Sequence, residues 1–189
     1  MKEHGPWTII ASCLVYTDAW TELRKDDVIR PDGLAGTHTV VRIKPGVSVL
    51  AIDDDGLVYL TDEFHYAVGR HSLEVVSGGI DPGESAREAA RRELREEIGI
   101  EAAEWTHVGT VDPFTTSLVS PTELFVARGL TFVTPDPEGT EQIRRVQMPL
   151  AEAERLVMES GITHAPSGVL ILKAARLFGG SLSKRGDEP

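Results

Sequence analysis

Three glutamates stand close together in the middle of the sequence: Glu93, Glu96 and Glu97. The spacing i, i+3, i+4 puts them on one side of a helix, where the like-charge pair Glu93–Glu97 costs about 0.2–0.5 kcal/mol. Ala86 and Ala90 share that side, so the carboxylates border the face that should pack inward. Carboxylates there are costly unless a cation meets them. Because Mg²⁺ takes oxygen ligands, the pattern predicts a divalent metal site.

The helix that must carry these glutamates is predicted from about Ala86 to Ile98. Ser85 and Glu88, three residues apart after a Pro-Gly turn, have the form of a capping box at its start. Gly99 follows at the position where a left-handed C-terminal cap favours glycine.

Arg92 lies four residues from both Glu88 and Glu96, so it can pair with either on the helix surface. A solvated helix laced with Glu–Arg pairs is the alternative interpretation of the segment. That alternative explains Arg92, but it leaves unexplained the repulsion between Glu93 and Glu97 and the glycine turn before the helix.

The segment 78–100 resembles the box of the Nudix hydrolases, which has the pattern G-x5-E-x7-R-E-U-x-E-E-x-G-U with U aliphatic. Every fixed position is filled, by Gly78, Glu84, Arg92, Glu93, Leu94, Glu96, Glu97, Gly99 and Ile100. The resemblance implies the Nudix fold, an α+β architecture with a mixed sheet between helices.

Looser matches on both sides of the box resemble the ADP-ribose pyrophosphatase branch of that family. They lie at 20–33, 63–70, 74–84 and 127–130. The branch implies hydrolysis of the diphosphate bridge of a nucleoside diphosphate-sugar such as ADP-ribose, which yields a nucleoside monophosphate and a sugar phosphate. It also implies a homodimer whose N-terminal strands form the interface and help to build the partner's pocket.

The box positions imply roles for individual residues. The expected ligands of Mg²⁺ or Mn²⁺ are Glu93 and Glu97, with Glu96 as a shared carboxylate and the carbonyl of Ser77 as a further ligand. Four box residues are expected to be structural, with Glu84 steadying the turn and Arg92 the glutamates; the four are Gly78, Glu84, Arg92 and Gly99.

The general base is where the chain departs from the branch. A glutamate in a loop beyond the box is usual there, but alignment back from Ala127 places Ser120 at that position. Nearby acids are Glu123 and Glu141, which can equally be ordinary exposed carboxylates, and Glu96 is a further alternative. The catalytic candidates are therefore Glu96, Glu97, Glu123 and Glu141.

Substrate contacts follow from the same resemblance. Trp20 is expected to stack on a base, Arg42 to contact a phosphate or ribose, and Glu74 to bond to the ribose or base. His65 replaces the arginine of a Gln-x-Arg triplet, here Glu63-Phe-His65. The loss of a fixed positive charge weakens the expectation of ADP-ribose itself as substrate.

Composition limits the function further. The 189 residues carry a formal net charge of −11 and no extended Lys/Arg cluster. That argues against nucleic-acid and acidic-membrane partners, which need a positive patch. Cys13, the single cysteine, lies in an apolar run and is expected in a core. With no 18-residue apolar stretch and no signal-peptide pattern, a cytoplasmic location is expected.

Strand and helix patterns alternate without a βαβ rhythm, which favours an α+β fold. N-terminal strands at 7–16, 21–29 and 38–44 predict an antiparallel sheet, and 47–52 with 57–61 predict a hairpin. Further strands are predicted at 73–76, 106–111, 124–133 and 143–148, and helices at 150–160 and 167–178. The expected division is 1–45 for dimerisation, 46–178 for the hydrolase and 179–189 as a disordered tail.

Two other functions fit the sequence less well. The same chemistry could act on NADH, a dinucleoside polyphosphate, a nucleoside triphosphate or capped RNA. A non-catalytic nucleotide-sugar sensor would be expected to have a degraded box and a DNA-binding domain, whereas this box is complete and the net charge is negative.

Overall fold

The computed structural model describes residues 1–136, 139 and 142–182. The chain forms two compact units. The first contains Met1–Pro45 and Asp112–Pro121, and the second contains Gly46–Val111 and the chain from Thr122 onward. The predicted division did not include 112–121 with the N-terminal segment, because that short run carries no pattern that distinguishes it from a loop.

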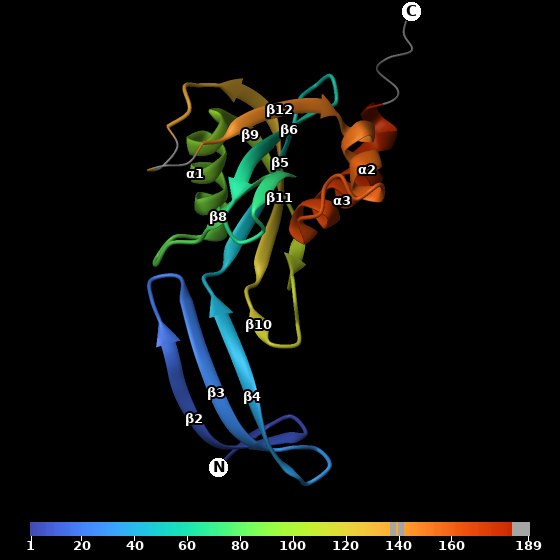
Figure 1. Ribbon diagram of the computed structural model, residues 1–189. Coiled ribbons are helices and arrows are strands. Elements are labelled where there is room, and N and C mark those ends of the chain that lie inside the picture. The colour runs from blue at the N-terminus through green and yellow to red at the C-terminus, as the bar shows by residue number, and fades with distance from the viewer. Residues whose placement is uncertain (137–138, 140–141, 183–189) are drawn as a thin grey trace, which may run out of the picture. The chain divides into compact units, whose positions relative to one another are not determined.

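The first unit is a five-stranded sheet in the order β1-β2-β3-β4-β10 (Figure 1). The pairs from β1 to β4 are antiparallel, which confirms the predicted N-terminal antiparallel sheet, and β10 runs parallel to β4. The strands are β1 (Lys2–His4), β2 (Trp7–Thr17), β3 (Thr21–Ile29), β4 (Ala35–Ile43) and β10 (Leu118–Val119).

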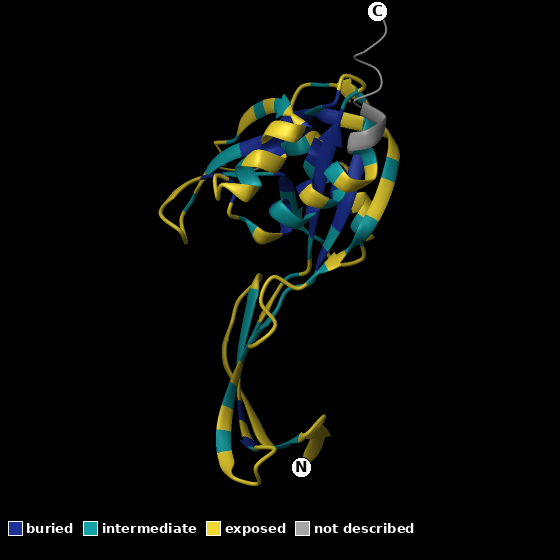
Figure 2. Ribbon diagram, turned by 90° about the vertical axis from the view of Figure 1, so that its right-hand side faces the viewer, coloured by how far each residue is buried: buried dark blue, intermediate teal, exposed yellow. Residues whose placement is uncertain are grey.

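The strands of the first unit are largely exposed, as the yellow and teal ribbon in Figure 2 shows. Cys13 is exposed on β2, so its predicted place in a core is wrong. The reason is that an apolar run marks a strand, but it does not show whether anything covers the strand. Asp26 and Val28 are the buried residues of this sheet among those described.

The second unit has a seven-stranded mixed sheet in the order β12-β6-β5-β11-β9, with β7 paired to β6 and β8 to β5. Strand β11 runs parallel to β5 and antiparallel to β9. The bounds are β5 (Gly46–Ile52), β6 (Leu57–His65), β7 (Arg70–Glu74), β8 (Val76–Gly79), β9 (Ile100–Val111), β11 (Thr122–Phe132) and β12 (Arg144–Pro149).

Helices cover both faces of this sheet (Figure 1). They are α1 (Ala86–Ile98), α2 (Leu150–Met158) and α3 (Ala165–Leu182). Alternate residues of β5 separate the two cores: Val49 and Ala51 pack with α1, whereas Leu50 and Ile52 pack with α2 and α3. Since β5 is buried on both faces, it reads as a continuous apolar run. The predicted sandwich of a mixed sheet between helices is confirmed.

Several boundaries differ from the prediction, and the predicted strand 73–76 is two strands, β7 and β8. Strand β9 begins at Ile100 rather than at Thr106, because the cap at Gly99 passes the chain directly into it. Helix α3 continues to Leu182, so residues 179–182 of the expected tail are helical, and the rest of the tail lies outside the described residues. The two glycines before Leu182 each cost the helix about 1 kcal/mol relative to alanine, and the helix still forms.

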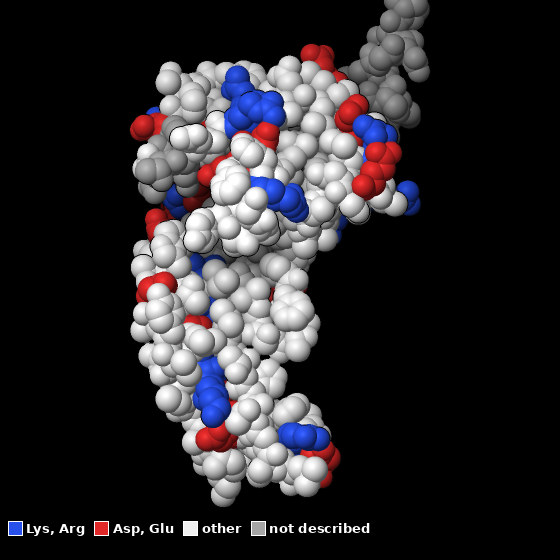
Figure 3. Space-filling model, in the orientation of Figure 1, with Lys and Arg blue, Asp and Glu red and all other residues white. Residues whose placement is uncertain are grey.

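Charge is distributed without a dominant basic patch on the face shown in Figure 3, where Lys and Arg side chains form separate small groups. None of the helices in the described ranges is long and apolar enough to cross a membrane.

Candidate active site

Helix α1 has the predicted bounds and both predicted caps. The Ser85 side chain accepts a hydrogen bond from the Glu88 backbone N–H, and the Glu88 carboxylate accepts one from the Ser85 N–H. Gly99 closes the helix in the left-handed region at φ 64° and ψ 45°. Leu94 and Ile98 are buried against the sheet, so the caps and the apolar face together fix where the glutamates point.

A close contact joins the helix to strand β8. A Cβ atom added to Gly78 would lie 2.0 Å from both Cδ and Oε1 of Glu93. No side chain other than hydrogen fits at residue 78 while Glu93 keeps this position. The glycine before the helix therefore lets a carboxylate lie directly against the backbone of β8.

Arg92 organises the carboxylates of the box. Its Nε and Nη2 donate to the two carboxylate oxygens of Glu84, each at 3.0 Å, and Nη2 also donates to the carbonyl of Gly79 at 2.9 Å. Its Nη1 donates to Glu93 at 2.8 Å and to Glu96 at 3.3 Å. The hydrogen bond to Glu84 raises the pKa of Arg92 despite partial burial, and the same bond lowers the pKa of Glu84.

The expected pairing of Arg92 with Glu96 is confirmed, but the pairing with Glu88 is wrong. The Glu88 carboxylate is engaged by Ser85 in the capping box. The guanidinium instead reaches Glu84 in the turn, a contact that spacing along a helix cannot reveal.

The fixed positions of the box thus carry four carboxylates, Glu84, Glu93, Glu96 and Glu97, and one guanidinium, that of Arg92. Among the described residues, no three Asp, Glu, His or Cys side chains are close enough to enclose a metal ion. Arg92 bonds to both Glu93 and Glu96. The possible metal ligands are nevertheless all carboxylate oxygens, and negative charge is in excess. Ligands of this chemical type suit a hard divalent cation.

Glu123 lies on the same face of the sheet as α1. Its neighbours in β11 on that face are Phe125 and Ala127, which pack in the α1 core. The strand registers place Gly78, Val47 and Glu123 in one row across β8, β5 and β11. With strands about 4.8 Å apart, the Cα atoms of Gly78 and Glu123 are about 10 Å apart.

The Glu123 carboxylate bonds to β9, with His107 Nε2 at 2.6 Å and Thr110 Oγ1 at 2.9 Å. Sequence reasoning missed His107, because a lone histidine in a strand carries no motif. Ser120 belongs to the first unit. Glu141 lies outside the described residues.

Glu74 and His65, both expected to contact substrate, are paired with each other at 3.3 Å. The other Glu74 oxygen lies 2.9 Å from Nδ1 of His164, which precedes α3. His164 in turn lies 2.8 Å from the buried Ser167 hydroxyl. Burial raises the pKa of Glu74, but the hydrogen bond with His164 and its other partners outweigh burial, so the net pKa is lowered. Glu74 therefore ties β7 to the start of α3.

We expect the pairing of Glu74 with His65 and His164 to make the folding stability depend on pH in the acid range. The pKa of Glu74 is below its ordinary value of 4.5 in the folded protein. The ionised Glu74 carboxylate therefore contributes to folding stability above pH 4.5. This contribution is lost as the pH falls through the lower pKa that Glu74 has in the folded protein. In thermal unfolding followed by circular dichroism, wild type should be more stable than Glu74→Gln at neutral pH. The difference in stability between the two proteins should shrink at pH values below 4.5. A difference that does not change with pH would contradict this.

Trp20 and Arg42 lie together in the first unit, where both line a cavity of about 320 Å³. The indole is 60% exposed, and Nζ of Lys44 lies 4.6 Å from its ring centroid. The Asp18 carboxylate accepts hydrogen bonds from the backbone N–H groups of Trp20 and Thr21, and so fixes the turn. An exposed aromatic ring beside two cationic side chains is suited to a nucleotide base and its phosphates.

Comparison with known proteins agrees with this geometry. Residues 42–164 match the NUDIX domain, and residues 7–41 match the nucleoside diphosphate sugar hydrolase N-terminal domain. The chain is 33% identical over 180 residues to the ADP-ribose pyrophosphatase of Mycobacterium tuberculosis, which covers 92% of this chain and 86% of the relative. It is 32% identical over 124 residues to the ADP compounds hydrolase NudE of Escherichia coli, 65% of each.

A solved structure described as the crystal structure of ADP compounds hydrolase superposes with a TM-score of 0.81, at 23% identity, over 96% of this chain and 98% of that one. That likeness shows the fold. The chain belongs to the Nudix family and is a Nudix hydrolase. Within the family it carries the N-terminal domain of the nucleoside diphosphate sugar hydrolases.

Proposed function

We propose that this Nudix hydrolase cleaves the diphosphate bridge of a nucleoside diphosphate-sugar such as ADP-ribose, with Mg²⁺ as cofactor. The observation that carries the proposal is the complete box, in which Arg92 holds Glu84, Glu93 and Glu96 while Glu93 lies against Gly78. The 33% identity to an ADP-ribose pyrophosphatase over 92% of the chain supports the substrate class.

In this proposal Glu93, Glu97 and Glu96, with the carbonyl of Ser77, supply the oxygen ligands for Mg²⁺, and Mn²⁺ can replace it. Bound there, the ion would neutralise charge on the diphosphate and polarise its oxygens. Arg92 and Glu84 keep the carboxylates in position. A water molecule attacks one phosphorus, the bridging P–O bond breaks, and the products are a nucleoside monophosphate and a sugar phosphate.

Trp20 and Arg42 are proposed to hold the nucleotide, by stacking on the base and by contact with a phosphate or ribose. His65 and Glu74 were predicted to contact substrate as well. Because Glu74 pairs with both His65 and His164, we propose that His65 and Glu74 position β7 and α3 and bind no substrate. A cytoplasmic location stays a prediction.

A broader substrate range is the second candidate. The Escherichia coli relative is named for ADP compounds in general, and His65 replaces an arginine of the branch. A panel of ADP-ribose, ADP-glucose, GDP-mannose, UDP-sugars, NADH and nucleoside triphosphates, assayed with Mg²⁺, separates the candidates. Preferred cleavage of nucleoside diphosphate-sugars supports the first. Equal rates on NADH support the second, and no cleavage of any compound contradicts both.

Glu123 is proposed as the general base, in place of the loop glutamate that Ser120 replaces. Its row across the sheet reaches Gly78, and His107 and Thr110 orient its carboxylate. We expect Glu123→Gln to lower turnover by about a hundredfold or more without changing metal affinity. Glu141, which the sequence also offered, would be tested by the matched Glu141→Gln.

Measured kcat and metal titrations check the assignment, with Glu104→Gln, an exposed carboxylate on β9, as control. Turnover of Glu123→Gln close to wild type would show that Glu123 is not the base. Loss of turnover in Glu141→Gln instead would move the role there, and Glu96 would carry it if both variants stay active.

A homodimer formed through the first unit is also proposed. Strand β2 exposes a run of large apolar side chains, Ile10, Leu14, Val15 and Tyr16, each at least 44% exposed. We take these exposed apolar side chains as the basis of an interaction surface. Light scattering should give about twice the chain mass of 20.6 kDa, and Leu14→Lys should shift it toward a single chain. A monomeric wild type at micromolar concentration would contradict this.

A further inference from the structure

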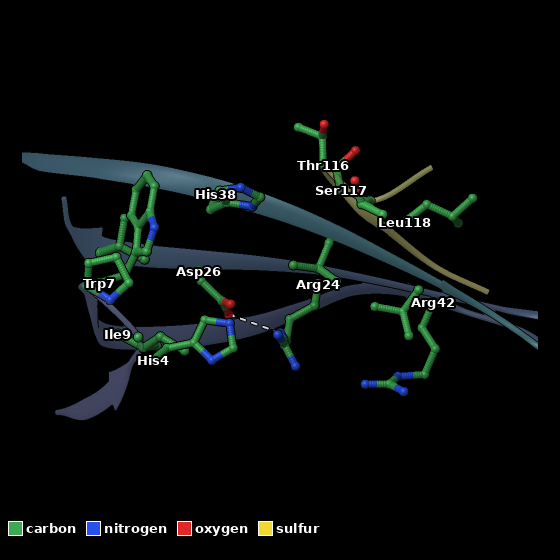
Figure 4. Close-up of a pocket in the computed structure, with 16 residues that line it drawn as sticks. His4, Trp7, Ile9, Arg24, Asp26, His38, Arg42, Thr116, Ser117 and Leu118 are labelled. Carbon is green, nitrogen blue, oxygen red and sulfur yellow. Dashed lines mark ion pairs between the residues drawn. The ribbon is translucent and has the colours of Figure 1, made fainter. Parts of the chain in front are cut away.

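A cavity of about 570 Å³ in the first unit lies on one face of its sheet (Figure 4). Alternate residues of β3 and β4 form much of its lining, because side chains two apart in a strand share a face. Arg24 and Asp26 of β3 stand opposite Val40 and His38 of β4. None of the Nudix box residues lines this cavity, and neither does Trp20, whereas Arg42 lines both this cavity and that of Trp20.

A buried carboxylate lies at the polar end of the cavity. Asp26 is 3% exposed and accepts a hydrogen bond from the Ser12 hydroxyl. That bond lowers the pKa of Asp26 more than burial raises it. Nε of Arg24 lies 3.0 Å from the carboxylate, so Asp26 holds the arginine on the cavity side of the sheet.

The cavity carries more positive than negative side chains, in a chain whose net charge is −11. Arg24 and Arg42 line it together with the single carboxylate of Asp26 and with the imidazoles of His4 and His38. Figure 4 shows both guanidinium groups extending to the same side of the strands. Arg42 has no ion-pair partner within the described part of the chain. Two guanidinium groups on one side suit a phosphate, which each can bind through two N–H groups.

The rest of the lining is apolar and aromatic. Trp7 packs edge-on against His38, with ring centroids 5.7 Å apart and an interplanar angle of 83°. Ile9, Val28 and Leu118 continue the apolar wall. An apolar wall with a few convergent polar groups and a volume of several hundred Å³ is the usual form of a small-molecule site.

We propose that this cavity is a second ligand site, distinct from the Nudix box, for an aromatic phosphate about the size of a nucleoside monophosphate. The ring packs against Trp7 and the apolar wall, and the phosphate binds Arg24 and Arg42. Arg42 is shared with the nucleotide site proposed at Trp20, whereas the ring contact at Trp7 and the phosphate contact at Arg24 go beyond the hydrolase activity.

The test is a titration with AMP in EDTA, followed by tryptophan fluorescence. The chain has three tryptophans, and we expect a saturable component of the signal that is lost in Trp7→Phe and retained in Trp20→Phe, the variant that removes any signal from the cavity of Trp20. Adenosine, which lacks the phosphate, should bind at least about tenfold more weakly.

The decisive variant removes the arginine and its buried partner together, as Arg24→Met with Asp26→Asn, so that no unpaired charge is left inside the sheet. We expect at least about tenfold weaker AMP binding, with circular dichroism verifying the fold. The control Lys25→Met removes a positive charge from the opposite face of the same strand and should bind AMP like wild type.

Four results would overturn the proposal. One is wild-type affinity in the double variant, and another is adenosine binding as tightly as AMP. The third is loss of the signal in Glu97→Gln, which would place the bound AMP in the Nudix box. The fourth is the absence of any saturable signal in the folded protein.

Discussion

Glu97→Gln is expected to lower turnover by about a thousandfold or more, because a divalent ion that loses a carboxylate ligand loses several kcal/mol of charge stabilisation. The fold should survive, since Glu97 is only partly buried and the apolar face of α1 is carried by Leu94 and Ile98. The measurement is steady-state kinetics over a range of Mg²⁺ concentrations, with thermal unfolding as a check on the fold.

The matched control for this variant is Glu101→Gln, which alters an exposed carboxylate paired with Arg95 outside the box. It should keep wild-type turnover. Near wild-type turnover of Glu97→Gln, or full activity of the wild type in EDTA, would refute the assignment of Glu97 as a metal ligand.

Gly78→Ala is expected to be almost as damaging, although it removes no charged group. The new methyl group would lie 2.0 Å from the Glu93 carboxylate, so Glu93 must move and give up its bond with Arg92. Misplacing a catalytic group by about 1 Å can cost about a hundredfold in rate. We expect at least that loss in kcat, with a stability loss of about 1–3 kcal/mol for the crowding.

Gly168→Ala is the control, because a methyl group there meets Val157 at an ordinary 3.4 Å. It should leave turnover unchanged and the helix at least as stable. If Gly78→Ala kept wild-type turnover and metal affinity, the position of Glu93 against β8 would have no part in catalysis.

The parts of the site that were predicted correctly are local in sequence. The bounds of α1 follow from Ser85, Glu88 and Gly99, which act on backbone groups within one turn of the helix. Most strands of the two sheets follow from alternation and from apolar runs, whereas the short strands β1 and β10 were not predicted. Contacts between residues close together in the sequence depend on their spacing alone, so they can be predicted from the sequence.

The parts that were not predicted depend on which elements the fold brings together. The bond of Arg92 to Glu84 requires the turn to fold back on the helix, and the pairing of Glu74 with His164 joins residues 90 positions apart. The cavity at Arg24 and Asp26 requires knowledge of the strand register. Cys13 shows the same limit, because an apolar strand looks alike whether it is covered or exposed.

The return of residues 112–121 to the first unit means that the backbone passes between the two units three times, near residues 45, 111 and 121. A protease that cuts only after Pro45 would therefore leave an N-terminal fragment that still pairs with β10 through Val41 and Arg42. Deleting residues 1–45 would leave β10 without its partner strand β4. The first unit thus includes a segment from the middle of the chain. Removing or adding residues 1–45 alone would therefore disrupt the sheet of that unit.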